Sequence, residues 1–284
     1  MAKTQDIRRR IRSVRNTMQL TKAMKMVSAA KLRRAQEQML RARPYARSML
    51  RVLRSLASRV VVESHPLLEQ RPARRVRVVV FTADKGLCGA FNAGVLRTAE
   101  AFVATQREQE LSFVAVGKKG RDLIGRRRPL AAEWVDVFRL VEFATAARIA
   151  RSLIDVQLAR EVDAVHLVYN EFKSAIQARP VVQRLLPVEP AQLGAGETGD
   201  DYLYEPEPAA IFDALLPHYV ENQVHQAMLE SSAAEHAARM SAMDSATNNA
   251  GELIDSLTLT MNRVRQASIT TEIIEVVSGA EALG

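Results

Sequence analysis

The sequence is short of cysteine, of aromatic residues and of long apolar runs. Cys88 is the only cysteine among 284 residues, which excludes an intrachain disulfide and fits a reducing compartment. No stretch reaches the ~18 apolar residues of a transmembrane helix. The N-terminus lacks the apolar segment of a signal peptide, so we expect it to be part of the folded chain. The length predicts one or two domains.

Recognisable catalytic and metal-binding patterns are also lacking. The five histidines are isolated, without the spacing of a metal site. His166 is expected in a strand and in the core. Glu171 is a single carboxylate, which makes no acid/base pair. We therefore expect no catalytic residue, no cofactor and no metal ion.

One segment, TADKGLCGAFN at residues 82–92, lies between an expected strand and an expected helix. Doubly wound domains place a ligand at this point. However, the segment matches neither GxGxxG nor GxxxxGK[ST]. Turn and helix-start roles explain Gly86 and Gly89 better, and a lone cysteine is usually a small buried hydrophobe. A nucleotide-binding enzyme stays open as an alternative.

Charge is distributed unevenly along the chain. The net charge is +8, but residues 1–59 carry 17 Lys and Arg against only Asp6 and Glu37. Residues 207–284 carry 11 Asp and Glu against Arg239, Arg263 and Arg265. A basic and an acidic end suit two helices of one chain that lie side by side, an attraction that salt partly screens. Nucleic-acid binding is a third hypothesis, weakened because no aromatic residue before Tyr45 could stack on bases.

Both ends of the chain predict long helices. From Ile7, steps of four and three residues reach Val60 along a heptad seam, which is typical of a coiled coil. The seam becomes polar and small between Thr21 and Ala30. Pro44 lies within this helix, and we expect a bend near Arg43. The stretch from about Pro208 to Gly284 is rich in Ala, Leu, Met, Glu and Gln, with a possible break at Pro217. Its β-branched end, ITTEIIEVV, is still predicted as helix.

The middle of the chain alternates between strand and helix patterns. Strands are expected at residues 76–81, 111–116, 165–169 and 181–186, and helices at 90–105, 118–125 and 145–161. This order implies βαβ units and a largely parallel sheet. Residues 187–200 read as a loop. The fold class is α/β: a long antiparallel coiled coil of the N- and C-terminal helices plus a Rossmann-like α/β domain with a mostly parallel sheet. The expected parts are 1–60 (helix), 75–204 (α/β domain) and 208–284 (helix).

Four segments together resemble one family. They are IRRRIRSVRNTMQLTKAMKMVSAAKLRRAQ with ARPYA near the N-terminus, TADKGLCGAFN from Thr82, DYLYEPEP from Asp201, and ARMSAMDSATNNAGELI with NRVRQASITTEIIEVVSGAEAL near the C-terminus. They resemble the gamma subunit of F-type ATP synthases over essentially the whole chain. The two terminal motifs are highly specific.

The resemblance implies a noncatalytic rotor shaft. In that family the terminal helices turn within a ring of alpha and beta subunits, and proton flow through a ring of c subunits drives them. The α/β domain lies on the c ring beside the epsilon subunit. The implied partners are thus alpha, beta, epsilon and delta subunits and the c ring, with no nucleic acid, and with the membrane reached only through the c ring. The implied location is the cytoplasmic face of a bacterial plasma membrane.

The resemblance also implies contact residues. Contacts to the alpha/beta ring carry over to Met24, Lys25, Arg239, Arg265, Gln266, Thr270 and Glu272, and contacts to the c ring to Tyr204 and Glu205. Lys25 departs from the family, which often has an acid or a simple polar residue there. The dithiol insertion of plastid members is absent. We also expect the C-terminal helix to run on alone from Thr271, past the start of the N-terminal helix.

Overall fold

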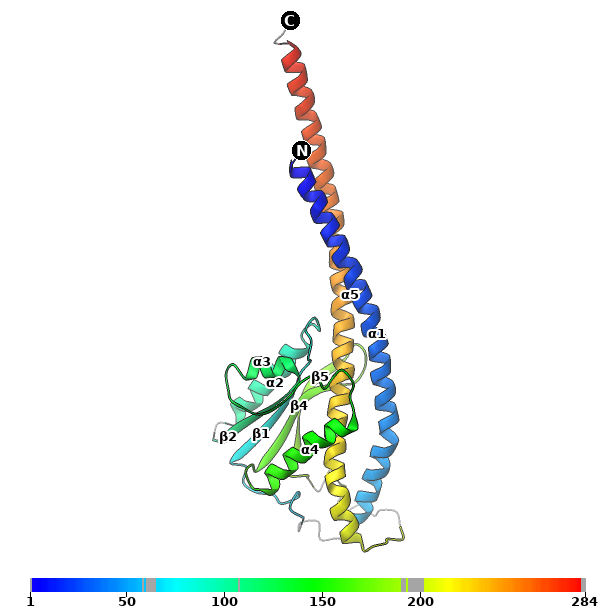
Figure 1. Ribbon diagram of the computed structural model, residues 1–284, viewed down its shortest axis with the longest axis vertical. Coiled ribbons are helices and arrows are strands. Elements are labelled where there is room, and N and C mark those ends of the chain that lie inside the picture. The colour runs from blue at the N-terminus through cyan, green and yellow to red at the C-terminus, as the bar shows by residue number, and fades with distance from the viewer. Residues whose placement is uncertain are drawn as a thin grey trace. The chain divides into compact units, whose positions relative to one another are not determined.

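The computed structural model describes residues 2–57, 59, 65–106, 108–189, 193 and 202–281. The chain forms two compact units, Met1–Ser28 with Arg239–Gly284, and Ala29–Ala238. Helix α1 (Ala2–Ala57) and helix α5 (Pro208–Glu281) each contribute residues to both units (Figure 1). Neither Pro44 nor Pro217 ends its helix. Most of the expected loop at 187–200, and Val60 of the seam, lie outside the described residues.

The first unit is an antiparallel pair of helices. Thr21 on α1 meets Thr247 on α5, and four residues further along α1, Lys25 meets Asp244. The partner number on α5 falls as the number on α1 rises, so the two helices run in opposite directions. Figure 1 shows the N-terminal part of α1 lying along the C-terminal part of α5. The predicted antiparallel pairing is therefore confirmed in this unit.

The predicted heptad seam is confirmed by burial. Each described seam position of α1 from Ile7 to Leu56 is buried or half-buried, whereas most positions between them are exposed. Three-and-four spacing places these side chains on one stripe of the helix, which is the stripe that a partner covers. The seam position Leu53 in the second unit has no exposed surface.

The C-terminal part of α5 has no covering partner among the described residues of the first unit. The helix continues to Glu281, so the helical interpretation of its β-branched end is correct. From Ile269 to Ser278 each side chain is exposed, and α5 extends beyond the start of α1 (Figure 1). The expected unaccompanied end therefore begins two residues before Thr271.

The second unit holds a five-stranded sheet in the order β3-β2-β1-β4-β5. Its strands are β1 (Arg75–Phe81), β2 (Glu110–Val116), β3 (Leu130–Trp134), β4 (Ala164–Phe172) and β5 (Ala178–Leu186). Neighbouring strands are parallel except β4 and β5, which are antiparallel. The helices between them are α2 (Phe91–Thr105), α3 (Lys118–Ile124) and α4 (Phe143–Leu158). The mostly parallel α/β domain is thus confirmed.

Sequence reasoning missed strand β3. Its sequence, LAAEW, is short and alanine-rich, and it lies at the edge of the sheet, where only β2 pairs with it. An edge strand buries one face weakly, so its alternation of half-buried and exposed side chains gives little hydrophobic signal.

The two faces of the sheet pack against different helices. Along β1, Val76, Val78 and Val80 belong to a cluster with Val95 of α2 and Ile124 of α3. Val79 and Phe81, which point the other way, belong to the larger cluster that includes α4 and α5. Alternate strand residues face opposite sides of a sheet, so a β-branched run is what two covered faces require.

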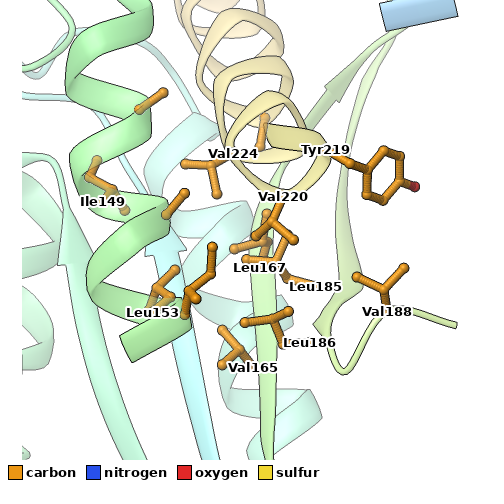
Figure 2. Close-up of a cluster of buried hydrophobic side chains, with 14 of the residues drawn as sticks. Ile149, Leu153, Val165, Leu167, Leu185, Leu186, Val188, Tyr219, Val220 and Val224 are labelled. Carbon is orange, nitrogen blue, oxygen red and sulfur yellow. The ribbon is translucent and has the colours of Figure 1, made fainter. Parts of the chain in front are cut away.

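The larger cluster joins α4, α5 and the sheet (Figure 2). Ile149 and Leu153 of α4 pack with Val165 and Leu167 of β4, and Val220 of α5 lies over the same strand. Within this unit, α5 from Ala227 to Ala237 is buried on all sides. Four of these residues are alanines (Ala227, Ala233, Ala234 and Ala237), whose small side chains permit close packing.

His166 of β4 lies mid-strand as expected, but it faces α2, on the side of the sheet opposite α4 and α5, and it is half-buried and not a core residue. Its ring lies 4.8 Å from that of Phe102. Burial, with the nearby charge of Arg184, lowers the pKa of His166 to about 4. The ring is therefore neutral at physiological pH and acts as a packing group.

Candidate partner-contact surface

The polar part of the seam is a pair of direct side-chain contacts between α1 and α5. The hydroxyls of Thr21 and Thr247 lie 2.8 Å apart, and Lys25 Nζ donates to Asp244 Oδ1 at 2.6 Å. Ser28 Oγ donates to the carbonyl of Met24 at 2.8 Å. Sequence analysis assigned Lys25 to a partner, but here its ammonium group already pairs with Asp244 of the same chain.

An exposed apolar stripe lies beside this polar seam on α1. Leu20 is 61% and Val27 56% exposed, and the half-buried Met24 lies between them at helical spacing. Residues at i, i+4 and i+7 share one face of a helix. Sequence analysis assigned Met24 to partner contact but not Leu20 and Val27, whose signal in the sequence is that they are apolar yet outside the heptad seam.

The predicted contact residues of α5 fall into two environments. Arg239 is buried, with 9% of its surface exposed. Arg265, Gln266, Thr270 and Glu272 are exposed near the unaccompanied end. Thr270 Oγ1 donates to the carbonyl of Gln266, and Ser268 Oγ to Glu272 Oε1, so both bonds stay within the helix. The structure therefore groups the last four residues on one stretch of helix and leaves Arg239 apart from them.

Around Tyr204, the second unit exposes a different surface. The Tyr204 hydroxyl lies 2.6 Å from Ser55 Oγ of α1, and the Arg59 guanidinium is 5.5 Å from the Tyr204 ring centre. Glu205 is exposed, as is Leu203, which sequence reasoning missed. Tyr204 is thus held by its own chain, and it fixes the segment that presents Leu203 and Glu205 to solvent.

The segment at residues 82–92 uses its polar groups to join neighbouring loops. Asp84 Oδ1 accepts hydrogen bonds from the backbone amides of Lys118 and Asp136, both at 3.0 Å. Thr82 Oγ1 accepts one from Gly120 at 2.7 Å, and Asn92 Oδ1 accepts one from Ala83.

The same segment also packs against α5. Cys88, Ala83 and Phe91 are buried in one cluster with Ala234 of α5. In doubly wound domains a ligand lies at the carboxyl ends of the parallel strands. Here the side chains of this loop and helix α5 occupy that place. The structural interpretation of Thr82–Asn92 and of Cys88 is therefore supported.

Glu221, Glu230 and Glu235 of α5 are buried in the second unit, and the first two show what burial does to a carboxyl group. Burial alone would raise the pKa of Glu221, but hydrogen bonds from His218 and Arg151 lower it. Arg151 Nε lies 2.7 Å and His218 Nδ1 2.9 Å from this carboxylate. Burial raises the pKa of Glu230, although Gln226 donates to its Oε1 at 2.9 Å. Among the described residues, Glu230 Oε2 has no hydrogen-bond partner.

The described residues contain neither a candidate metal site nor a candidate membrane span. Histidine, cysteine and acidic side chains do not gather there in any group that could hold a metal ion. Nor do the described helices include one that is both long and apolar enough to cross a bilayer.

Comparison with known protein families gives one match over nearly the full chain. The model of a family described as ATP synthase matches residues 3–283. Among curated proteins, the chain is 51% identical to an ATP synthase gamma chain of Solibacter usitatus, over 98% of each chain. It is 48% identical to that of Pelotomaculum thermopropionicum, over 100% of each.

Solved structures give matching folds. A chain of the central stalk and c ring of the mitochondrial ATP synthase of Tetrahymena thermophila is 30% identical, with a TM-score of 0.62 over 80% of this chain and 99% of that one. A chain of the Euglena gracilis mitochondrial enzyme gives a TM-score of 0.72 over 99% and 95%, at 19% identity.

Proposed function

The chain belongs to the family of ATP synthase gamma chains and acts in the central rotor of that complex. From this premise we propose which of its surfaces contact the other parts of the complex. Rotation of a proton-driven c ring turns the shaft. The shaft then carries the beta subunits through states of different affinity for ADP, phosphate and ATP. The three parts 1–60, 75–204 and 208–284 serve as shaft helix, base domain and shaft helix.

The observation that carries this proposal is the exposed end of α5. Ile273, Ile274 and Val277 are each more than half exposed on a helix that has no partner there among the described residues. Apolar side chains on such an end favour a covered position in an assembly. We propose that the alpha/beta ring surrounds this end, as a sleeve surrounds an axle.

Two groups of residues then contact the ring. Arg265, Gln266, Thr270 and Glu272 offer exposed polar groups just before the apolar tip. On α1, Met24 with Leu20 and Val27 offers an apolar stripe, and Lys25 offers the part of its ammonium group that Asp244 leaves exposed. Arg239 is buried, and its proposed role is to support the seam beneath this surface. Polar, exchangeable contacts suit a bearing that must release as well as hold.

The base domain would contact the c ring through the segment around Tyr204. Leu203 and Glu205 are the exposed members of this segment, and the bond between Tyr204 and Ser55 positions them. We further propose that the epsilon and delta subunits complete the assembly. In this arrangement the chain is a peripheral subunit that reaches the membrane only through the c ring, on the cytoplasmic face of a bacterial plasma membrane.

The shaft is proposed to be noncatalytic. The loop at residues 82–92, which sequence analysis held open as a nucleotide site, bonds to its own neighbours and packs on α5. The chemistry then lies with the beta subunits, and the gamma chain acts by position alone.

The proposal is tested by reconstitution. The isolated chain should neither hydrolyse ATP nor bind it at this loop, and mixing it with purified alpha and beta subunits should restore ATPase activity. Failure to co-assemble would remove the rotor interpretation. Saturable ATP binding that is lost on Asp84→Ala would restore the enzyme alternative.

Met24→Lys tests the ring contact. We expect a new positive charge within the apolar stripe to reduce proton pumping per ATP hydrolysed, while the chain still folds because Met24 is half-buried at the edge of the seam. Met24→Leu keeps an apolar side chain and is the control. Normal pumping by Met24→Lys, in an assembled complex, would contradict the assignment.

A further inference from the structure

The face of the sheet opposite α4 and α5 carries a groove that the rotor role does not use. It lies between α2 and α3, which share that face (Figure 1), and has a volume of about 390 Å³. It is lined by α2, by Phe113 of β2, by α3 and by the turn after α3. The groove is therefore a separate feature of the second unit.

The floor of the groove is apolar. Leu96 and Val103 of α2, Phe113, and Leu123 and Ile124 of α3 line it. Leu123 is 42% exposed. Burial of such a side chain by a ligand would be favourable in proportion to the apolar area removed from water.

The rim of the groove is strongly basic. Arg97, Arg126, Arg127 and Arg128 line it, and Glu100 is the single carboxylate among the described residues that do. Glu100 is bound to Arg127 at 2.6 Å. Three guanidinium groups therefore lack a carboxylate partner within the groove, and they repel one another without a bound anion.

The basic turn has a fixed backbone. The amides of Arg127 and Arg128 both donate to the carbonyl of Ile124 at 2.9 Å. The Arg128 guanidinium lies 5.1 Å from the Phe113 ring centre, a cation–π contact that holds it over the apolar floor. The backbone of this turn and the Arg128 side chain are therefore preorganised, which lowers the entropic cost of binding.

We propose that this groove binds an anionic phospholipid, with its phosphate at the arginines and an acyl chain along the apolar floor. Guanidinium groups bind phosphate through strong, often bidentate hydrogen bonds. Apart from the arginines and Glu100, the described lining residues offer no hydrogen-bonding side chain. A nucleotide base would need such groups at its edges, whereas an acyl chain needs none. This inference does not depend on the rotor role.

The test is calorimetric titration of the full chain with dihexanoyl-phosphatidylglycerol below its micelle concentration. We expect saturable binding that falls at least ten-fold in the double variant Arg126→Gln/Arg128→Gln and also falls in Leu123→Gln. The matched control is Arg139→Gln/Arg263→Gln, which removes the same two charges from exposed positions outside the groove and should bind as wild type does. Thermal melting of each variant shows that it is folded.

Three comparison ligands decide between explanations. Dihexanoyl-phosphatidylcholine should bind more weakly, because its head carries no net charge. Inorganic phosphate and ATP should also bind more weakly, because they lack an acyl chain. Equal binding of any of the three, absence of binding by the phosphatidylglycerol, or unchanged affinity in the arginine double variant overturns the proposal.

Discussion

The same helix, α5, behaves in two opposite ways along its length. From Ala227 to Ala237, within the second unit, each side chain is buried, while from Ile269 to Ser278, in the first unit, each is exposed. Both stretches are rich in small or apolar residues, so composition does not explain the difference. What differs is how much of its own chain lies against each stretch.

The buried stretch shows what a helix covered by its own chain requires. Five of its eleven residues are polar and buried all the same: Glu230, Ser231, Ser232, Glu235 and His236. Burial forces such carboxyls either to gain charged partners, as Glu221 does just before the stretch, or to shift toward the neutral form, as Glu230 does. The exposed stretch carries Ile273, Ile274 and Val277, which no described part of the chain covers. The first stretch therefore stabilises the fold, and the second is available to a partner.

The largest expected effect comes from the buried part of α5. Met228→Ala should lower the free energy of unfolding by about 2–5 kcal/mol, because Met228 has no exposed surface and truncation leaves a cavity. Ile273→Ala, on the exposed end, should change it by less than about 0.5 kcal/mol. Urea unfolding of the full chain measures both. Similar values for the two variants would remove the comparison.

A smaller effect is expected at the buried carboxylate Glu221. Arg151→Ala should cost about 1–3 kcal/mol, because a buried acceptor loses a charged donor. The lowered pKa of Glu221 means that its contribution is present above the ordinary glutamate pKa and lost as pH falls through the folded-state value. As pH falls, the Arg151→Ala variant should therefore begin to lose stability at a higher pH than wild type does. Stability measured from pH 2 to 7 tests this.

The matched control for Arg151 is Arg179. It also donates to a glutamate that has a second basic partner, since Lys173 lies 3.9 Å from Glu171. Glu171, however, is partly exposed, so Arg179→Ala should cost only about 0.5 kcal/mol. A larger loss at Arg179 than at Arg151 would show that burial does not decide the effect.

Glu230 should give an effect of the opposite sign. Burial raises its folded-state pKa, so its contribution to stability is full below the unfolded pKa and is lost as pH rises through the folded value. Glu230→Gln removes the ionisation and should be more stable than wild type by about 1 kcal/mol at pH 8, with little difference at pH 4. Thermal unfolding at the two pH values measures this. An equal effect at both would contradict the assignment.

The smallest effect is expected in the first unit. Lys25 and Asp244 are both nearly half exposed, so their pairing should contribute about 0.2–1 kcal/mol. A double-mutant cycle with Lys25→Ala and Asp244→Ala measures the coupling directly. Coupling well above this range would mean that the ion pair behaves as a buried one.

Periodic features were predictable from the sequence, and they account for most of the fold. The heptad seam of α1 was correct at each described position, because burial on one stripe of a helix repeats at fixed spacing. The β-branched run at Val76–Phe81 identified the central strand, which has two covered faces. Edge strand β3 was missed because LAAEW lacks such a pattern.

The proposed contact surface was only partly predictable. Met24 came from resemblance, but Leu20 and Val27 required the exposure of α1 in the structure to distinguish them from core residues. Likewise, the resemblance indicated Tyr204 and Glu205 but not the neighbouring Leu203. The intrachain pairing of Lys25 with Asp244 joins residues 219 positions apart, and no local pattern specifies it.

The two polar pairs between α1 and α5 fix the register of the two helices. A slide of α5 by one heptad would bring Thr21 opposite Met240 or Ile254, and Lys25 opposite Ala237 or Gly251, in place of Thr247 and Asp244. Such a shift keeps apolar contacts elsewhere but leaves a hydroxyl and an ammonium group without their polar partners. When the observed register is extended to Ala2 at the start of α1, with one residue of α5 for each residue of α1, it reaches about residue 267 of α5. The pairing of the two helices ends there. The two threonines and the ion pair, some 20 residues away, therefore set the length of α5 that remains uncovered and open to a partner. That length is about 20 Å at 1.5 Å per residue.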